Sequence, residues 1–190
     1  MKITIEWLVS KNACHDGLDW FVEQGKEVEP IPLLYLLIEE NQLEWANWLL
    51  VRVMEYKQYV SYAVFAAEQV IKNYEKQYPD DKRPREAIEA AKRCIENPSD
   101  ENKKEAANAA RATDRATANA SYRAAYWATD SASLAAWAAC SAADWAADSS
   151  ADSAAWSSGS AAWGAKNAAS NAKILKKILK YGIELLTEGK

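Results

Sequence analysis

Large apolar side chains return every three or four positions along the first half of the chain, which is the spacing of helices with one buried face. In the first such segment Ile5, Leu8 and Val9 share an apolar face. Gly25 ends the second segment, and Pro32 suits the first turn of the third because its missing N–H would have no partner there. The helices predicted in this half are Thr4–Ser10, Asp16–Glu23, Pro32–Glu40, 43–56, 59–76 and one that begins near Pro84.

The segment EKQYPDDKRPREAIEAAKR interrupts this pattern with two prolines, two adjacent aspartates and two arginines. Pro79 disfavours helical backbone at Tyr78, so one helix is expected to end there. Asp80 or Asp81 is a candidate N-cap for the next helix, and Pro84 fits its first turn. The segment is therefore predicted to join two helices.

Composition changes near Glu105, because the apolar residues of 106–172 are almost all alanine or aromatic. Alanine favours helix but buries little area, so helices built from it must approach closely, and tryptophans must fill the remaining volume. Ser99 or Asp100 is a candidate cap for the first of two or three such helices.

These patterns together predict an all-α fold. We expect a compact multi-helix array in a single domain spanning residues 1–190. Its first part, 1–98, has short helices with large aliphatic side chains, and its second part, 99–190, has closely packed helices rich in alanine and tryptophan.

The net charge of −4 argues against nucleic acid as a partner, because phosphate binding requires a surplus of Lys and Arg. The sequence shows no apolar run of about 18 residues and no cleavage-like site after MKITIEWLVSK, so we expect a cytoplasmic protein without membrane contact. Cys14, Cys94 and Cys140 are widely spaced, which indicates free and mostly buried thiols in a reducing compartment.

Residues of the metal-ligating types cluster in ACHDGLDW, which contains Cys14, His15, Asp16 and Asp19. His15 is the only histidine, and a catalytic zinc site needs about three protein ligands, so we expect no metal there. Instead, Asp16 should help to cap a helix, His15 should be exposed and Cys14 buried. Neither a nucleophile elbow nor a phosphate-binding glycine loop occurs, so we expect no enzymatic activity and no cofactor.

Three aspartates, Asp144, Asp148 and Asp152, follow one another at steps of four residues. Like charges at this spacing destabilise an isolated helix. Either this acidic strip meets a basic partner, such as a nuclease surface, or the helix lies against the arginines of its predecessor, namely Arg111, Arg115 and Arg123.

The stretch from Leu43 to Arg93 contains EWANWLLVR and then YAVFAAEQVIKNYEKQYPDDKRPREAIEAAKR, followed by an alanine-rich tail. It resembles an alanine-rich helical family of bacterial immunity proteins. EWLVSKNACHDGLDWF near the N-terminus is similar to a leader found in phage and bacterial relatives. The resemblance implies an all-helical protein that neutralises a toxin by binding it. The tail departs from the family in its many Trp and Ser residues, so a shared target does not carry over.

A simple joint between helices requires a proline and a capping residue, but not Arg83 and Arg85. One interpretation is structural: an arginine pairs with Asp81, Glu75 or Glu68 and holds the two helices together. The other is that the arginines face a pocket or a partner, because a guanidinium fork suits phosphate or carboxylate.

Two functions follow as hypotheses. The first is a non-catalytic binding protein of the immunity or counter-defence type, with the acidic strip and the Arg83–Arg85 joint as contacts to a toxin or defence protein. The second is a phage-type sponge for a signalling nucleotide, because aromatic faces stack on bases. Alanine-lined faces also pack between chains, so a homo-oligomer is compatible with either. The nucleotide pocket would be formed by Tyr78, Arg83, Arg85, Glu68 and Trp127.

Overall fold

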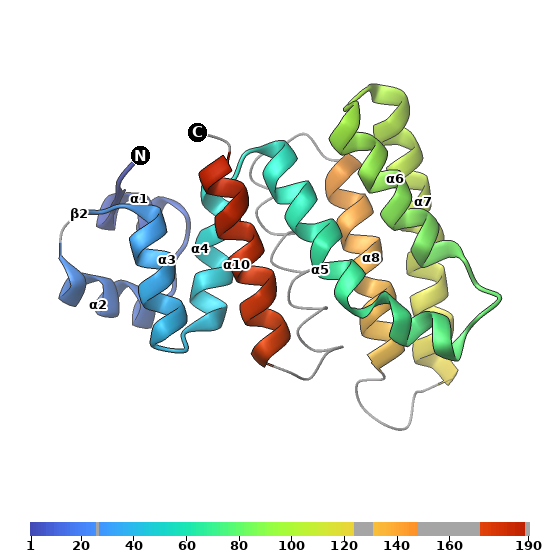
Figure 1. Cartoon of the computed structure of the whole chain (residues 1–190), viewed down its shortest axis with the longest axis horizontal. Coiled ribbons are helices and arrows are strands. Elements are labelled where there is room, and N and C mark those ends of the chain that lie inside the picture. The colour runs from blue at the N-terminus through green and yellow to red at the C-terminus, as the bar shows by residue number, and fades with distance from the viewer. Residues whose placement is uncertain (26, 124–130, 148–171, 189–190) are drawn as a thin grey trace.

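The computed structural model describes residues 1–25, 27–123, 131–147 and 172–188, without the side chains of 115–123, 131–137 and 145. Within these ranges the chain is an array of helices with one pair of short strands (Figure 1), which confirms the predicted all-α class. The helices are α1 (Ile5–Ser10), α2 (His15–Gln24), α3 (Pro30–Glu39), α4 (Leu43–Val53), α5 (Tyr56–Gln77), α6 (Arg83–Glu96), α7 (Asp100–Arg123), α8 (Ser131–Ala147) and α10 (Ala172–Glu188), and the strands are β1 (Ile3–Thr4) and β2 (Glu27–Val28).

The two strands, which the sequence did not predict, pair antiparallel with Ile3 opposite Val28. They hold the start of the chain beside the segment that enters α3. In the short α1 that follows, Leu8 is buried but Val9 is 54 % exposed, so the prediction of a shared face was wrong for Val9. A six-residue helix that packs along Ile5 and Leu8 turns the next residue about 100° away from that contact.

Asparagine ends both α1 and α3 in the same way. Asn12 and Asn41 have φ values of 57° and 60°, the left-handed conformation that asparagine tolerates better than most residues. The chain then folds back onto the last turn, with N–H···O=C bonds of 3.0 Å from Ala13 to Leu8 and 2.8 Å from Gln42 to Leu37. These sharp turns produce two helix pairs, α1 with α2 and α3 with α4.

Glycine, proline and capping residues explain most of the observed helix ends, including some that differ from the predicted ones. The end of α2 at Gly25 is confirmed, but α3 starts at Pro30 rather than Pro32, because Pro30 already supplies the fixed φ of a first turn. The boundary between the helices predicted at 43–56 and 59–76 lies about three residues earlier in the chain, since α4 ends at Val53 and α5 begins at Tyr56. A capping box between Glu55 and Gln58, with the Glu55 N–H donating to Gln58 at 2.9 Å, starts α5 at Tyr56.

The predicted joint between α5 and α6 is present, with Tyr78 at the end of α5 and Pro84 in the first turn of α6. Lys82, rather than Asp80 or Asp81, occupies the N-cap position. Asp81 nevertheless accepts the Arg83 N–H at 3.1 Å, because the turn brings its carboxylate against the start of the helix. Ser99 accepts the Asn102 N–H at 3.2 Å at the start of α7.

Buried alanines line the contacts of α8 with α5, α6 and α7, and Figure 1 shows α8 among these helices. Small side chains allow such close approach: the Cys140 thiol of α8 lies 3.2 Å from the Ala110 carbonyl oxygen of α7. The predicted close, alanine-lined packing is confirmed for the alanines of α8 that are fully buried, which are Ala138, Ala139, Ala142, Ala143 and Ala146.

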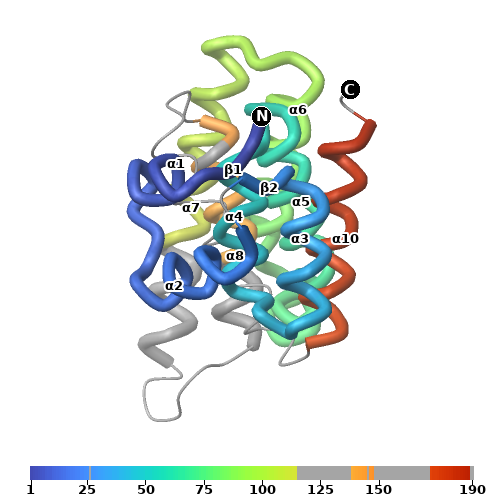
Figure 2. The backbone as a smooth tube through the Cα atoms, turned by 90° about the vertical axis from the view of Figure 1, so that its left-hand side faces the viewer, coloured from blue at the N-terminus to red at the C-terminus, as the bar shows by residue number. Residues whose placement is uncertain are grey.

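The last helix, α10, returns to the first half of the chain and packs on α3, α4 and α5 (Figures 1 and 2). Its buried face consists of Leu175, Ile178, Leu179 and Ile183 around Gly182. One continuous apolar core therefore runs from Ile3 in β1 to Ile183 in α10. In the described part of the chain, no helix is long and apolar enough to cross a membrane.

Candidate functional site

The joint between α5 and α6 is held by Asp81. Its carboxylate accepts hydrogen bonds from both ends of the Arg83 guanidinium, at 2.9 Å from Nε and 2.5 Å from Nη2, and from the Tyr74 hydroxyl at 2.7 Å. On the other side, the Thr113 hydroxyl of α7 donates to the Arg83 carbonyl oxygen at 3.0 Å. Three helices thus converge on one carboxylate and the backbone beside it.

These hydrogen bonds and the burial of the joint shift the pKa values of Asp81 and Tyr74. Hydrogen bonds from Arg83, and secondly from Tyr74, outweigh the effect of burial and lower the pKa of Asp81 to about 2. The pKa of Tyr74 is raised, mainly by burial and also by its bond to the Asp81 carboxylate. At neutral pH the joint therefore contains a charged carboxylate, a charged guanidinium and a neutral phenol.

Arg85 and Glu68 form separate ion pairs between the same two helices. Arg85 pairs with Glu75 at 2.8 Å, and Glu68 pairs with Lys92 at 2.8 Å. These contacts, together with the Arg83–Asp81 pair, match the structural interpretation of the joint. Both arginine side chains remain about one third exposed, at 37 % for Arg83 and 34 % for Arg85.

Where the structure describes them, the side chains named for a nucleotide pocket already contact other side chains of the protein. Tyr78 stacks at a tilt on Tyr74, with ring centroids 4.9 Å apart, and Arg83, Arg85 and Glu68 are in the ion pairs above. Trp127 lies outside the described residues. The contacts place these side chains along α5 and α6 and give no specific support to a nucleotide site.

Only the first aspartate of the acidic strip can be located. Asp144 is exposed on α8, beside the buried Ala143, whereas Asp148 and Asp152 lie outside the described residues. Arg111 of the neighbouring α7 is also exposed and donates to Asn108 at 2.7 Å. The side chains of Arg115 and Arg123 are not described, so the two interpretations of the strip stay open.

The cluster around His15 is a surface feature. His15 lies 3.5 Å from Asp19 one turn along α2, and both side chains are largely exposed. Among the residues that the structure describes, no three His, Cys, Asp or Glu side chains come together as metal ligands would. The expectation for Cys14 was wrong: it is exposed at the N-cap position, immediately before the first turn of α2. Cys94 is the buried thiol, and Cys140 is partly buried.

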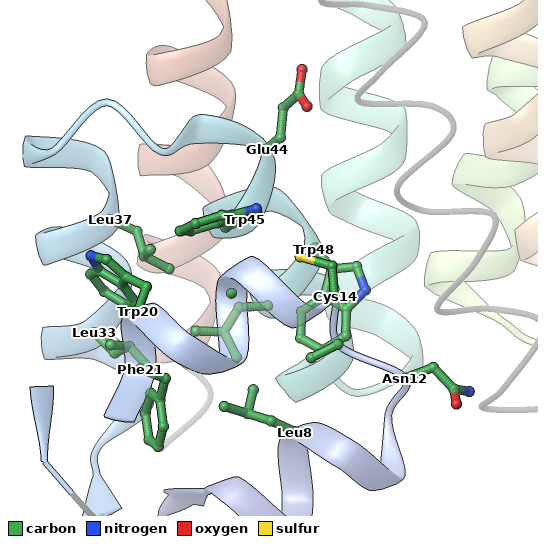
Figure 3. Close-up of a pocket in the computed structure, with 13 residues that line it drawn as sticks. Leu8, Asn12, Cys14, Trp20, Phe21, Leu33, Leu37, Glu44, Trp45 and Trp48 are labelled. Carbon is green, nitrogen blue, oxygen red and sulfur yellow. The ribbon is translucent and has the colours of Figure 1, made fainter. Parts of the chain in front are cut away.

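A pocket of about 260 Å³ lies between α1, α2, α3 and α4, and sequence reasoning missed it (Figure 3). Its deeper walls are buried aliphatic and aromatic side chains, and the partly buried Trp20, Trp45 and Trp48 complete it. Glu44 belongs to its edge, and its carboxylate points away from the tryptophan rings in Figure 3. The lining residues are Leu8, Asn12, Ala13, Cys14, Gly17, Trp20, Phe21, Leu33, Leu37, Glu44, Trp45, Trp48 and Leu49.

Contacts with neighbouring side chains fix Trp20 and Trp48 of the pocket. The Trp20 indole N–H donates to Glu40 at 2.8 Å, and its ring lies 6.0 Å from that of Trp45. Arg52 stacks on Trp48 with its guanidinium carbon 4.0 Å from the ring centroid. Burial lowers the pKa of Arg52 to about 10, so it is charged at neutral pH and the cation–π contact persists.

Comparison with known proteins identifies the central part of the chain. A model of the family described as Imm-5 like putative immunity protein matches residues 50–154, more than half of the chain. This match begins at the end of α4 and includes α5, α6, α7 and α8. Comparisons with curated proteins and with solved structures found no match.

Proposed function

The chain belongs to the Imm-5 like putative immunity protein family, and from this premise we propose that it neutralises a toxin protein by binding it directly, without catalysis. The family match carries the proposal, because it covers the helices α5 to α8 that form one packed unit. A binding protein of this kind needs a rigid surface more than a reactive group, and the buried alanines of α8 favour such rigidity.

We place the main contact on the acidic strip of Asp144, Asp148 and Asp152. Asp144 supports this choice, since it is exposed on α8 while Ala143 and Ala146 are buried. A row of carboxylates attracts a basic partner surface, speeds association and disfavours acidic competitors. The expected target is therefore a toxin with a basic face.

Arg83 and Arg85 act on this surface mainly as positioning residues. Their ion pairs to Asp81 and Glu75 hold α6 against α5, and α8 packs on both of these helices. Because each arginine remains about one third exposed, a partner carboxylate can also reach it from outside. Loss of either pair should thus weaken binding less than loss of the strip.

The test starts from the full chain immobilised as bait in a bacterial lysate. We expect a protein to be retained in stoichiometric amount, to stop growth when expressed alone, and to become harmless when the chain is co-expressed. Formation of a stable complex from the two purified proteins, measured by isothermal titration, should accompany the rescue. A harmless captured protein, such as a defence factor, or rescue without a complex would contradict the proposal.

Neutralising the strip then tests the contact itself. We expect at least a tenfold loss of affinity, mostly through slower association, with a weaker dependence on salt. A control with the same change in net charge on α2 should bind normally, and equal losses in both variants would exclude a specific strip. The strip variant is Asp144→Asn, Asp148→Asn and Asp152→Asn, and the control is Asp16→Asn, Asp19→Asn and Glu23→Gln.

A further inference from the structure

We propose that the pocket between α1 and α4 is a binding site for a small, neutral aromatic molecule with about two fused rings. This site goes beyond the proposed function. Its lining residues run from Leu8 to Leu49, so it lies entirely before the family-matched residues 50–154. Nothing in toxin binding by α5 to α8 requires a cavity there.

The chemistry of the walls selects a neutral apolar ligand. Leucines, Phe21 and three tryptophans supply most of the lining, and the Trp20 N–H is already bonded to Glu40. The lining has no Lys or Arg to pair with an anion, and the Glu44 carboxylate points away from the rings, so an ion would gain no ion pair inside the pocket for the hydration it loses, which costs several kcal/mol or more. Aromatic ligands gain in addition from edge-to-face and offset contacts with the indole rings.

The volume sets the size of the ligand. An apolar cavity of about 150 Å³ in an engineered protein stays dry and holds benzene. The pocket here measures about 260 Å³, which leaves room for a second fused ring but not for a nucleotide. Pockets for drug-sized ligands generally begin near 300 Å³, slightly above this volume, so the expected ligand is smaller than a drug-sized molecule.

The pocket is also organised before any ligand enters. Trp20 is fixed by Glu40 and by its contact with Trp45. Trp48 is held by Arg52, which is not among the lining residues, so this stack lies outside the cavity. Walls that keep their positions reduce the ordering cost of binding. The turn at Asn12 completes the pocket by leading the chain from α1 into Cys14 at its wall.

Cys14 provides a direct readout of occupancy. It lines the pocket and is exposed, whereas Cys94 is buried and burial raises the pKa of Cys140 to about 12. N-ethylmaleimide should therefore modify Cys14 first in the folded protein. 1-Naphthylamine, a fluorescent probe with two fused rings that is neutral at pH 7, should bind one molecule per chain, and saturating probe should slow the modification of Cys14 at least fivefold. Naphthalene should displace the probe and protect Cys14 in the same way.

Two leucine substitutions on α2 distinguish probe binding in the pocket from probe binding elsewhere on the surface. A Cβ at Gly17 would lie 3.2 Å from the Cys14 sulfur and 4.0 Å from Trp45, so Gly17→Leu fills the cavity and should reduce probe affinity at least tenfold. Glu23→Leu adds the same side chain at an exposed position of α2 that does not line the pocket, and it should bind the probe normally.

Each result decides the proposal. Saturable binding, protection of Cys14 and selective loss in Gly17→Leu would establish the site. Absence of saturable fluorescence in the unmodified protein, unchanged modification of Cys14, or equal binding by Gly17→Leu would overturn it. If Gly17→Leu does not fold, the protection of Cys14 in the unmodified protein decides alone. A failure to bind any toxin would leave these measurements unaffected.

Discussion

Asp81 links α5 to α6, because its carboxylate accepts bonds from Arg83 and from Tyr74. Its pKa is lowered to about 2 from an ordinary value of 3.8. The charged form therefore stabilises the fold at pH values above about 4, and this contribution is lost as the pH falls from about 4 to 2. We predict that Asp81→Asn lowers the free energy of unfolding by about 2 kcal/mol at pH 7.

Urea denaturation at several pH values between 2 and 7 measures this effect. The difference in unfolding free energy between the unmodified protein and Asp81→Asn should be constant above pH 4.5 and should shrink toward pH 2. Asp80→Asn is the matched control, since Asp80 is exposed beside it and should change stability little. A difference that stays the same down to pH 2 would show that the Asp81 charge contributes nothing.

Sequence reasoning at the scale of residues succeeded where partners are close along the chain. Arg83 and Asp81 are two positions apart, and Arg85 and Glu75 bracket one joint, so their pairing could be listed in advance. The pocket could not be predicted, because Trp20 and Trp45 come from helices whose packing no local pattern specifies. The exposure of Cys14 was missed for the same reason: a small apolar residue suggests burial until the helix packing is known.

At the scale of helices and strands, too, the boundaries marked by a strong signal close along the chain were predicted and the others were not. Gly25 and Pro79 have strong backbone preferences, and the ends near them were predicted. The break between α4 and α5 depends on the capping box at Glu55. In the sequence this signal is less conspicuous than the apolar pattern, which continues across the break. The β1–β2 pair comprises two residues on each side and has no periodic signal at all.

Gly182 shows how closely α10 approaches its neighbours. A Cβ there would clash with Leu50 and would lie 2.9 Å from the Tyr62 ring. Leu50 and Tyr62 are fully buried, and Tyr62 is fixed by a 2.6 Å bond from its hydroxyl to Asn47. We predict that Gly182→Ala lowers the free energy of unfolding by about 1–2 kcal/mol, because the clash exceeds the gain of about 1 kcal/mol in helix propensity.

A double-mutant cycle in urea denaturation checks the cause. Leu50→Ala removes the methyl groups that the new Cβ would meet, so the two substitutions together should cost less than the sum of their separate effects. Strict additivity would contradict the clash. A stabilising Gly182→Ala would mean that α10 can shift outward without loss of packing.

At the scale of the whole molecule, α10 packs both on helices that precede the family-matched residues and on the matched helix α5. It contacts α3 and α4 on one side and α5 on the other, and the same apolar core includes Ile3, Leu50 and Ile183. A split into independent units would expose the buried face of α10. We therefore expect residues 1–190 to unfold as one cooperative domain, as the sequence led us to predict.

Hydrogen exchange followed by mass spectrometry tests this cooperativity. In the unmodified protein, the most protected amides of α3 and of α6 should report the same free energy of opening. Leu179→Ala, which truncates a fully buried side chain of α10, should lower both values equally by about 2–4 kcal/mol. Glu184→Ala, at an exposed position of the same helix, should change neither. If Leu179→Ala released α3 and left α6 protected, the pocket-bearing helices would be a separate unit, and ligand binding there would not stabilise the family-matched helices.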